Sequence, residues 1–293
     1  MSDPLAGSPA EEPAPYGGGA AGADAPIGVR RVRTVHLQRW KTEGRRWPML
    51  TAYDQNAASV FDEAGIPVLL VGDSASNNVF GHITSLPVTV DQLLSLTQAV
   101  TRSVSRALVV SDLPFGSYQR SPEQAFDTAV RFVKEGEAHA VKLEGGLVMA
   151  PHVRLLADAG IAVMGHIGFT PQAEHALGGY RVQGRGETAD RVLADAVALQ
   201  DAGAFAVVLE MVPGPVAAEV TRELSIPTIG IGAGPDCDAQ VLVWTDMAGF
   251  GSAKLGRFVK QYADLRGVLL DATQRFAADV ESGSFPAAEH TFD

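Results

Sequence analysis

The sequence has little cysteine, few basic residues and no long apolar run, and each shortage excludes a class of protein. Cys237 is the only cysteine, so no disulfide can form within the chain, and a reducing, cytoplasmic compartment is expected. No apolar run approaches the ~20 residues that a membrane helix needs. The 23 Lys and Arg residues face 34 Asp and Glu, giving a net charge of -11. We therefore expect neither nucleic acid nor an anionic membrane as a partner.

The first part of the chain differs from the rest. Residues 1–27 are rich in Ala, Gly and Pro, and contain four acidic residues but no Lys or Arg. Such a segment cannot bury enough apolar surface to fold, and it lacks the pattern of a secretory signal or a transit peptide. We predict a disordered tail over 1–27, a helix over 29–41, and a single catalytic domain over 28–293.

The remainder alternates short apolar runs with amphipathic stretches. The eight runs, rich in β-branched residues, cover 48–52, 68–72, 108–111, 138–143, 161–165, 205–209, 228–231 and 241–244. Helical stretches lie between several of them, at 56–64, 90–104, 121–135, 188–202 and 215–224. Ser121-Pro122 has the form of a helix start, with a capping serine and proline at the first position. Four glycines stand where helices should end: Gly65, Gly136, Gly160 and Gly203.

Near-continuous apolar strands that alternate with helices predict a buried parallel sheet. Eight such units predict a (β/α)₈ TIM barrel. An open, doubly wound sheet is the alternative, but no G-x-G-x-x-G follows the first strand. The glycine run at residues 230–234 follows the seventh strand instead, where it could leave room for a ligand group.

Ionisable residues cluster where these strands end, which is where TIM barrels place their catalytic groups. Strands two to six supply, in order, Asp73, Asp112, Lys142 with Glu144, His166 and Glu210. Each residue alone has an ordinary explanation, such as a turn former, a structural ion pair or a core histidine. Together they are too costly to bury in one barrel mouth unless a metal or ligand neutralises them.

Three of these groups suit a hard cation. Asp73, Asp112 and Glu144 offer oxygen ligands without a Cys or His pair, which favours Mg²⁺, or Mn²⁺, over Zn²⁺. Such an ion can be chelated by the carboxylate and keto oxygen of a 2-oxo acid and can stabilise its enolate. Glu210 is then available as the base, and Lys142 can offset developing negative charge.

Six motifs in this order resemble those of the ketopantoate hydroxymethyltransferase family. They are Val71–Ser74, Asp112–Phe115, Val141–Gly146, Gly165–Gln172, Val182–Gly186 and Ile229–Gly234. The similarity runs from about Val29 to the segment around His290 and leaves out only the tail. The Glu174-His175 pair and the segment 76–80 depart from the family pattern, which leaves loop packing and folate contacts open.

The resemblance implies a transferase of pantothenate biosynthesis. It would move a hydroxymethyl group from 5,10-methylenetetrahydrofolate to 3-methyl-2-oxobutanoate, with one Mg²⁺ per subunit. Asp73, Asp112 and Glu144 would hold the metal, and Glu210 would accept the proton. The substrate-binding residues would be Asp73, Ser74, Asp112 and Lys142, with His166 as a neighbour. Family members are ring-based homo-oligomers, typically decamers.

Two other functions remain open. A Mg²⁺-dependent carbon–carbon lyase or phosphonate mutase of the isocitrate-lyase type would share the scaffold and enolate chemistry. Such enzymes generally carry a reactive cysteine in a mobile loop, whereas Cys237 follows the seventh strand. A non-enzymatic binding barrel is the second alternative, but it would need neither the carboxylate cluster nor Glu210.

Overall fold

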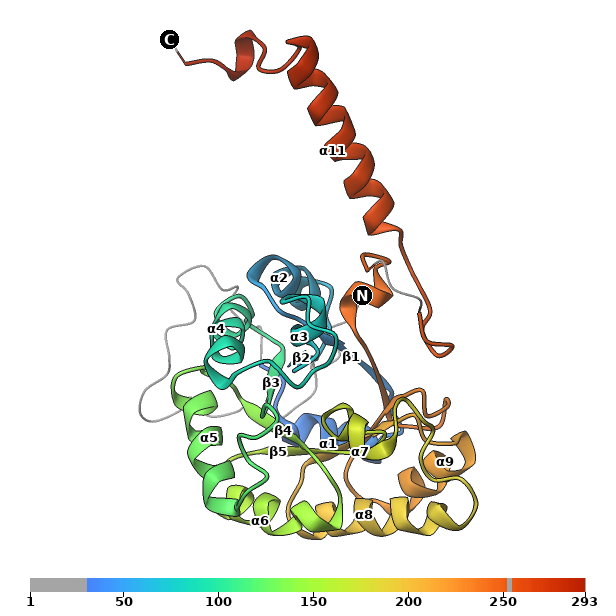
Figure 1. Ribbon diagram of the computed structural model, residues 1–293. Helices are drawn as coiled ribbons and strands as arrows, with labels where there is room; N and C mark the ends of the chain where they lie inside the picture. Colours follow the sequence, from blue (N-terminus) through green and yellow to red (C-terminus); the bar gives the residue numbers. More distant parts are fainter. Residues whose placement is uncertain (1–30, 252–254, 293) are drawn as a thin grey trace. The chain divides into compact units, whose positions relative to one another are not determined.

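The computed structural model describes residues 31–251 and 255–292, and it divides the chain into two compact units that meet between Val241 and Leu242. The first unit holds a closed barrel of parallel strands in the order β1 to β8 (Figure 1). The predicted TIM barrel is therefore confirmed. The predicted disordered tail lies outside the described residues, and the single domain over 28–293 stays a prediction.

From β1 to β8, each strand pairs in parallel with the next one along the chain. The strands are β1 (Trp47–Thr51), β2 (Val68–Val71), β3 (Leu108–Asp112), β4 (Ala140–Glu144), β5 (Val163–Gly168), β6 (Ala206–Glu210), β7 (Thr228–Ile231) and β8 (Ala239–Leu242). In register, Asp112 lies opposite Lys142, Glu144 opposite His166, and Gly168 opposite Glu210. The register thus brings the predicted charged residues to one end of the barrel.

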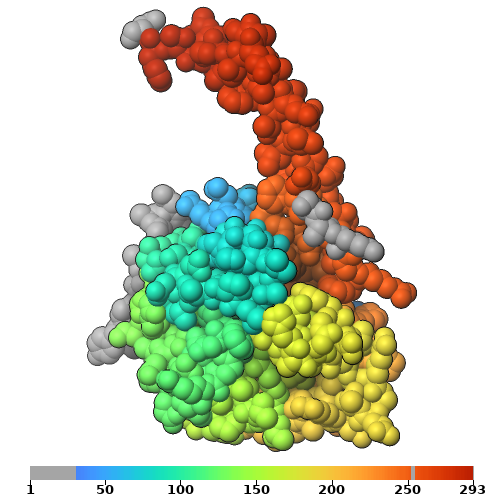
Figure 2. All heavy atoms as spheres, viewed as in Figure 1, coloured from blue at the N-terminus to red at the C-terminus, as the bar shows by residue number. Residues whose placement is uncertain are grey.

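Helices surround the barrel and lie between successive strands from β1 to β7, whereas β7 and β8 are joined without a helix (Figure 1). They are α1 (Thr34–Thr42), α2 (Gln55–Glu63), α3 (Ala75–Asn78), α4 (Val90–Thr101), α5 (Pro122–Lys134), α6 (Ala150–Asp158), α7 (Glu174–Leu177), α8 (Ala189–Asp201) and α9 (Gly214–Glu223). Short 3₁₀ turns cover Leu147–Met149, Pro171–Ala173 and Gly186–Thr188. In the space-filling view, the cyan and green segments, which include α2 to α5, pack closely over the visible face of the unit (Figure 2).

Most predicted elements are shifted by only one or two residues. The clearest error is the eighth strand, predicted at 241–244 but found at Ala239–Leu242, because Ala239 pairs with Ile229. The first helix begins at Thr34 rather than Val29, and α4 ends at Thr101 rather than 104. Helix α6 was not predicted, since its buried face is only His152, Val153 and Leu156.

The helix ends confirm most of the capping predictions. Ser121 Oγ accepts from the backbone N–H of Gln124 at 3.2 Å. Gly65 and Gly160 have φ of 83° and 84°, the left-handed conformation that ends a helix at low cost for glycine. Gly136 does not, because Glu137 takes the left-handed conformation there, with φ 58°.

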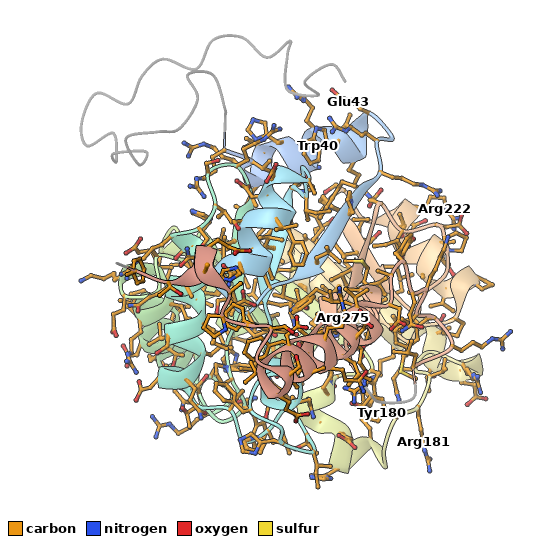
Figure 3. All side chains as sticks on the ribbon, turned by 90° about the horizontal axis from the view of Figure 1, so that it is seen from above. Trp40, Glu43, Tyr180, Arg181, Arg222 and Arg275 are labelled. Carbon is orange, nitrogen blue, oxygen red and sulfur yellow. The ribbon has the colours of Figure 1, made fainter. Side chains whose placement is uncertain are left out.

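The core of the first unit is apolar, and Trp40 of α1 packs with Trp47 of β1 at a ring distance of 6.5 Å. Trp40 is buried, whereas Glu43, just after α1, is exposed; both are labelled in Figure 3. The second unit contains α10 (Trp244–Met247) and α11 (Leu265–Ser282). Over the described residues, no helix has both the length and the apolar character needed to cross a membrane.

Candidate active site

The charged residues predicted from the strand ends all lie at the carboxyl ends of their strands. Five of them are less than 7% exposed: Asp73, Asp112, Lys142, Glu144 and His166. Glu210, the last residue of β6, is partly buried. Burial of this many ionisable groups requires that they satisfy one another or a bound ligand.

Asp112 links two neighbouring strands. Its Oδ2 accepts a hydrogen bond of 2.9 Å from the backbone N–H of Asp73. Its Oδ1 lies 2.8 Å from Lys142 Nζ, a charge contact without good hydrogen-bond geometry. Burial acts to lower the pKa of Lys142, but Asp112 and the other carboxylates outweigh it and raise that pKa. Lys142 is therefore an ammonium ion inside the barrel.

His166 lies between two carboxylates. Its Nδ1 is 3.2 Å from Glu144 Oε1, and its Nε2 is 3.1 Å from Glu210 Oε2. Lys142 Nζ also lies 3.2 Å from Nδ1. Burial and Lys142 act to lower the pKa of His166, but the two glutamates prevail and raise it to about 9. His166 is thus a cation at neutral pH that separates Glu210 from the other carboxylates.

A side-chain hydrogen bond positions Ser74, and the backbone geometry of neighbouring residues positions Glu210. Ser74 Oγ is 2.8 Å from the hydroxyl of Tyr53, which follows β1. A Cβ at Gly168 would meet Glu210 O at 2.3 Å, so only glycine allows β5 to approach β6 there. Met211, directly after Glu210, has φ 49°, an unusual conformation for a non-glycine residue. The chain thus turns sharply at the proposed base.

The site carries more negative than positive charge. Asp73, Asp112, Glu144 and Glu210 provide four carboxylates, whereas Lys142 and His166 provide two cations, which leaves two excess negative charges when all are ionised. Burial, then Asp112 and Glu144, raise the pKa of Asp73 well above its ordinary value. A divalent cation would balance this excess.

The donor set fits a hard cation in charge and chemistry, although the ligand shell is not assembled. Across residues 31–251 and 255–292, no three His, Cys, Asp or Glu side chains are arranged to share an ion. Asp112 instead contacts Lys142, and Glu144 contacts His166. Metal binding would therefore require these two contacts to be exchanged for contacts with the ion, and the predicted ligands Asp73, Asp112 and Glu144 stay a prediction.

Two residues of the site were not predicted because they come from loops. Gln172, in the 3₁₀ turn after β5, donates from Nε2 to Asp73 Oδ2 at 2.9 Å. Tyr118, after β3, donates to Gln172 Oε1 at 2.7 Å. Gln172 is the last residue of the motif Gly165–Gln172, and its place in that motif was the sequence feature that could have identified it. Tyr180 and Arg181, further along that loop, lie near the outside of the unit (Figure 3).

Solved structures with the same fold include one with a bound metal ion. A phosphonopyruvate hydrolase solved with oxalate and Mg²⁺ aligns with a TM-score of 0.57 and 12% identity, covering 88% of this chain and 92% of that one. A 2,3-dimethylmalate lyase of the PEP mutase/isocitrate lyase superfamily aligns with a TM-score of 0.53 and 13% identity, covering 87% and 86%. At such identities the likeness shows the fold alone.

Sequence relatives are far closer. Proteins named 3-methyl-2-oxobutanoate hydroxymethyltransferase are 68% identical over 286 residues in Nocardioides sp. and 65% identical over 283 residues in Saccharopolyspora erythraea. The matches cover 96% of this chain and 97% of the first relative, and 97% and 94% for the second. The family model for ketopantoate hydroxymethyltransferase matches residues 31–288. The chain therefore belongs to the ketopantoate hydroxymethyltransferase family.

Proposed function

We propose that the protein transfers a hydroxymethyl group from 5,10-methylenetetrahydrofolate to 3-methyl-2-oxobutanoate, which gives 2-dehydropantoate for pantothenate biosynthesis. The observation that carries this proposal is a buried cluster in which four carboxylates outnumber two cations and one carboxylate, Glu210, stands apart beyond His166. A metal-bound 2-oxo acid and a separate base need this division of carboxylates.

Asp73, Asp112 and Glu144 would hold Mg²⁺, directly or through water. When bound, the ion supplies a Lewis acid for the carboxylate and keto oxygens of the 2-oxo acid. The excess of two negative charges at the site supports a divalent ion, and the all-oxygen donor set supports Mg²⁺ over Zn²⁺. Lys142 and Ser74 would contact the substrate from the neighbouring strand ends.

Glu210, Lys142 and His166 have different roles in the reaction. Glu210 takes the proton from C3 of the 2-oxo acid, because it is the carboxylate farthest along the strand order from the proposed ligands. Lys142 is an ammonium ion that offsets the charge that develops on the substrate. His166, held as a cation, fixes Glu210 in place and would adjoin the substrate. The C3 carbanion then bonds to the methylene carbon as one of its two C–N bonds to the folate breaks, and the proton taken from C3 ends on that nitrogen. Water replaces the second folate nitrogen, so its oxygen becomes the new hydroxyl, its proton goes to that nitrogen, and 2-dehydropantoate and tetrahydrofolate are released.

Proton exchange at C3 tests the base directly. The wild-type protein with Mg²⁺ should exchange the C3 proton of 3-methyl-2-oxobutanoate in deuterated water, measured by NMR. We expect Glu210→Gln to slow the exchange by roughly 10²–10⁴-fold. Glu219→Gln, an exposed position on α9, is the matched control and should exchange normally. Unchanged exchange in Glu210→Gln with metal bound would exclude Glu210 as the base.

Product analysis separates this activity from the lyase alternative. The protein should form 2-dehydropantoate from 3-methyl-2-oxobutanoate and methylenetetrahydrofolate, and EDTA should abolish the reaction. Cleavage of a 2-hydroxy acid, or turnover without the folate, would overturn the proposed transfer.

We also propose a cytoplasmic homo-oligomer, a decamer by the family resemblance. Helix α11 supports association, because Leu265, Leu269, Phe276 and Val280 recur at helical spacing along it. Sedimentation velocity of the purified protein tests the oligomer, and a monomer at micromolar concentration would contradict it.

A further inference from the structure

Gln172 is the residue through which two of the proposed metal ligands are connected. Its backbone N–H donates to Glu144 Oε2 at 2.9 Å, and its side-chain Nε2 donates to Asp73 Oδ2 at 2.9 Å. It is 7% exposed and lies in the 3₁₀ turn Pro171–Ala173. One residue therefore contacts carboxylates from β4 and from the end of β2.

The orientation of the Gln172 amide is fixed by its neighbours. The backbone N–H of Glu144 donates to the Tyr118 hydroxyl at 3.0 Å. The hydroxyl donates its own proton to Gln172 Oε1 at 2.7 Å rather than to Glu144 O, which is farther away at 3.3 Å. Gln119 Nε2 is a second donor to the same oxygen, at 2.9 Å. The backbone N–H of Gly116 in turn donates to Gln119 Oε1 at 2.7 Å, which orients that amide.

With its oxygen directed at Tyr118 and Gln119, Gln172 presents its NH₂ group to Asp73. The second proton of this group reaches Leu113 O at 3.0 Å, so the donors and the acceptor of the amide all have partners. A rotated amide would place its oxygen against a carboxylate and a carbonyl, which is unfavourable. The network thus permits one orientation.

We infer that Gln172, held by Tyr118 and Gln119, is a positioning residue that sets the spacing of Asp73 and Glu144 for a divalent cation. It engages one oxygen of each carboxylate, Asp73 Oδ2 and Glu144 Oε2, and leaves the other oxygen of Asp73 for the ion. Groups that orient metal ligands in this way typically change metal affinity by about 10–100-fold when removed. The inference rests on the proposed function, since it assumes that these carboxylates bind Mg²⁺.

Metal affinity tests the inference apart from turnover. We would titrate Mg²⁺ alone into metal-free wild-type protein, Gln172→Ala and Tyr118→Phe by isothermal titration calorimetry. We expect the dissociation constant to rise about 10–100-fold in Gln172→Ala and less in Tyr118→Phe, because Gln119 still orients the amide. Activity at saturating Mg²⁺ should recover substantially in both variants, which a general loss of structure would not allow.

A matched control is Gln200→Ala. Gln200 Oε1 accepts from the backbone N–H of Ser225 at 2.7 Å, before β7 begins, so it is a hydrogen-bonded amide at the other end of the barrel. Circular dichroism in EDTA checks that each variant folds. If Gln172→Ala does not fold, Tyr118→Phe still tests the hydrogen-bond network.

The outcomes separate two failures. Folded Gln172 and Tyr118 variants that bind Mg²⁺ within twofold of an active wild type would overturn the inference alone. A rise in the dissociation constant of Gln200→Ala equal to that of Gln172→Ala would also overturn it. A wild type that neither binds Mg²⁺ nor forms 2-dehydropantoate would overturn the proposed function, and the inference with it.

Discussion

The two ends of the barrel both contain buried ionisable groups, but they use them differently. At the amino end, Asp62 accepts from the backbone N–H groups of Ser105, Arg106 and Ala107, at 2.7–3.2 Å. At the carboxyl end, charged side chains contact chiefly one another, and negative charge is in excess. A buried carboxylate that is fully hydrogen-bonded by backbone N–H groups stabilises a loop. Buried carboxylates that are not balanced by an equal number of cations indicate a ligand site.

Two histidines show the same contrast. His139, directly before β4, accepts from the Val109 N–H at 2.9 Å and lies 3.1 Å from Arg31 Nη1. Burial, then Arg31, lower the pKa of His139 to about 4. At the carboxyl end of the barrel, on β5, His166 lies between carboxylates and its pKa rises to about 9. The amino end keeps its histidine neutral, and the carboxyl end keeps its histidine charged.

The largest expected effect is on activity, from Asp73→Asn at the carboxyl end. Loss of one proposed ligand should lower kcat/KM by about 10³-fold. The free energy of unfolding in EDTA should stay equal or rise. Burial, then Asp112 and Glu144, raise the pKa of Asp73 in the folded state, so its ionised form destabilises the protein at neutral pH. Chemical denaturation beside steady-state kinetics checks both. A strongly destabilised variant would mean that this end is structural after all.

Asp62→Ala should give the opposite result at the amino end. It leaves three backbone N–H groups without their acceptor and should lower the free energy of unfolding by about 3–5 kcal/mol. The kcat of the folded protein should stay unchanged. Asp54→Ala is the matched control: Asp54 caps α2 through a single bond to Ala57 N, so we expect a loss of about 1 kcal/mol. Equal losses in the two variants would contradict this account.

The sequence predicted the carboxyl end well because a parallel barrel brings its strand ends together whatever the details. Residues two apart on a strand point to the same side, which predicted that Lys142 and Glu144 of β4 face the same way, and both are buried in the site. Gln172 and Tyr118 could not be found in this way, because loop geometry has no comparable period. The eighth strand was misplaced for a related reason. The position of β8 is set by its pairing with β7, and the side chains of Ala239 and Gln240 do not by themselves predict that pairing.

The pH dependence of the free energy of unfolding should reveal the contribution of His139. Its pKa is about 4 in the folded protein and near 6.5 when unfolded, so the unfolded state binds a proton first as the pH falls. Stability should therefore drop between pH 6.5 and 4, by about 3 kcal/mol in full. His139→Gln should lack this component, so the difference in unfolding free energy from wild type should shrink across that window. Parallel curves for the two proteins would show that His139 does not titrate as described.

Among the largely buried groups, the smallest effect should come from Lys41→Met, also at the amino end. Lys41 Nζ donates to Asp238 Oδ2 and to Thr221 O, both at 2.8 Å. Its loss leaves Asp238 with donors from the Thr228 backbone and hydroxyl, so no buried carboxylate is stranded. We expect about 1–2 kcal/mol, less than for Asp62→Ala.

Arg131→Met provides the surface control for this pair. Its guanidinium contacts Asp91 and Glu135 in largely exposed positions, so its loss should change the free energy of unfolding by less than about 1 kcal/mol. A gradient from Asp62 through Lys41 to Arg131 would show that stability follows the number of buried partners left without a bond. If Lys41→Met instead destabilised the protein as much as Asp62→Ala, the backbone N–H and hydroxyl of Thr228 would not be sufficient to stabilise Asp238. The amino end would then depend on ion pairs as the carboxyl end does.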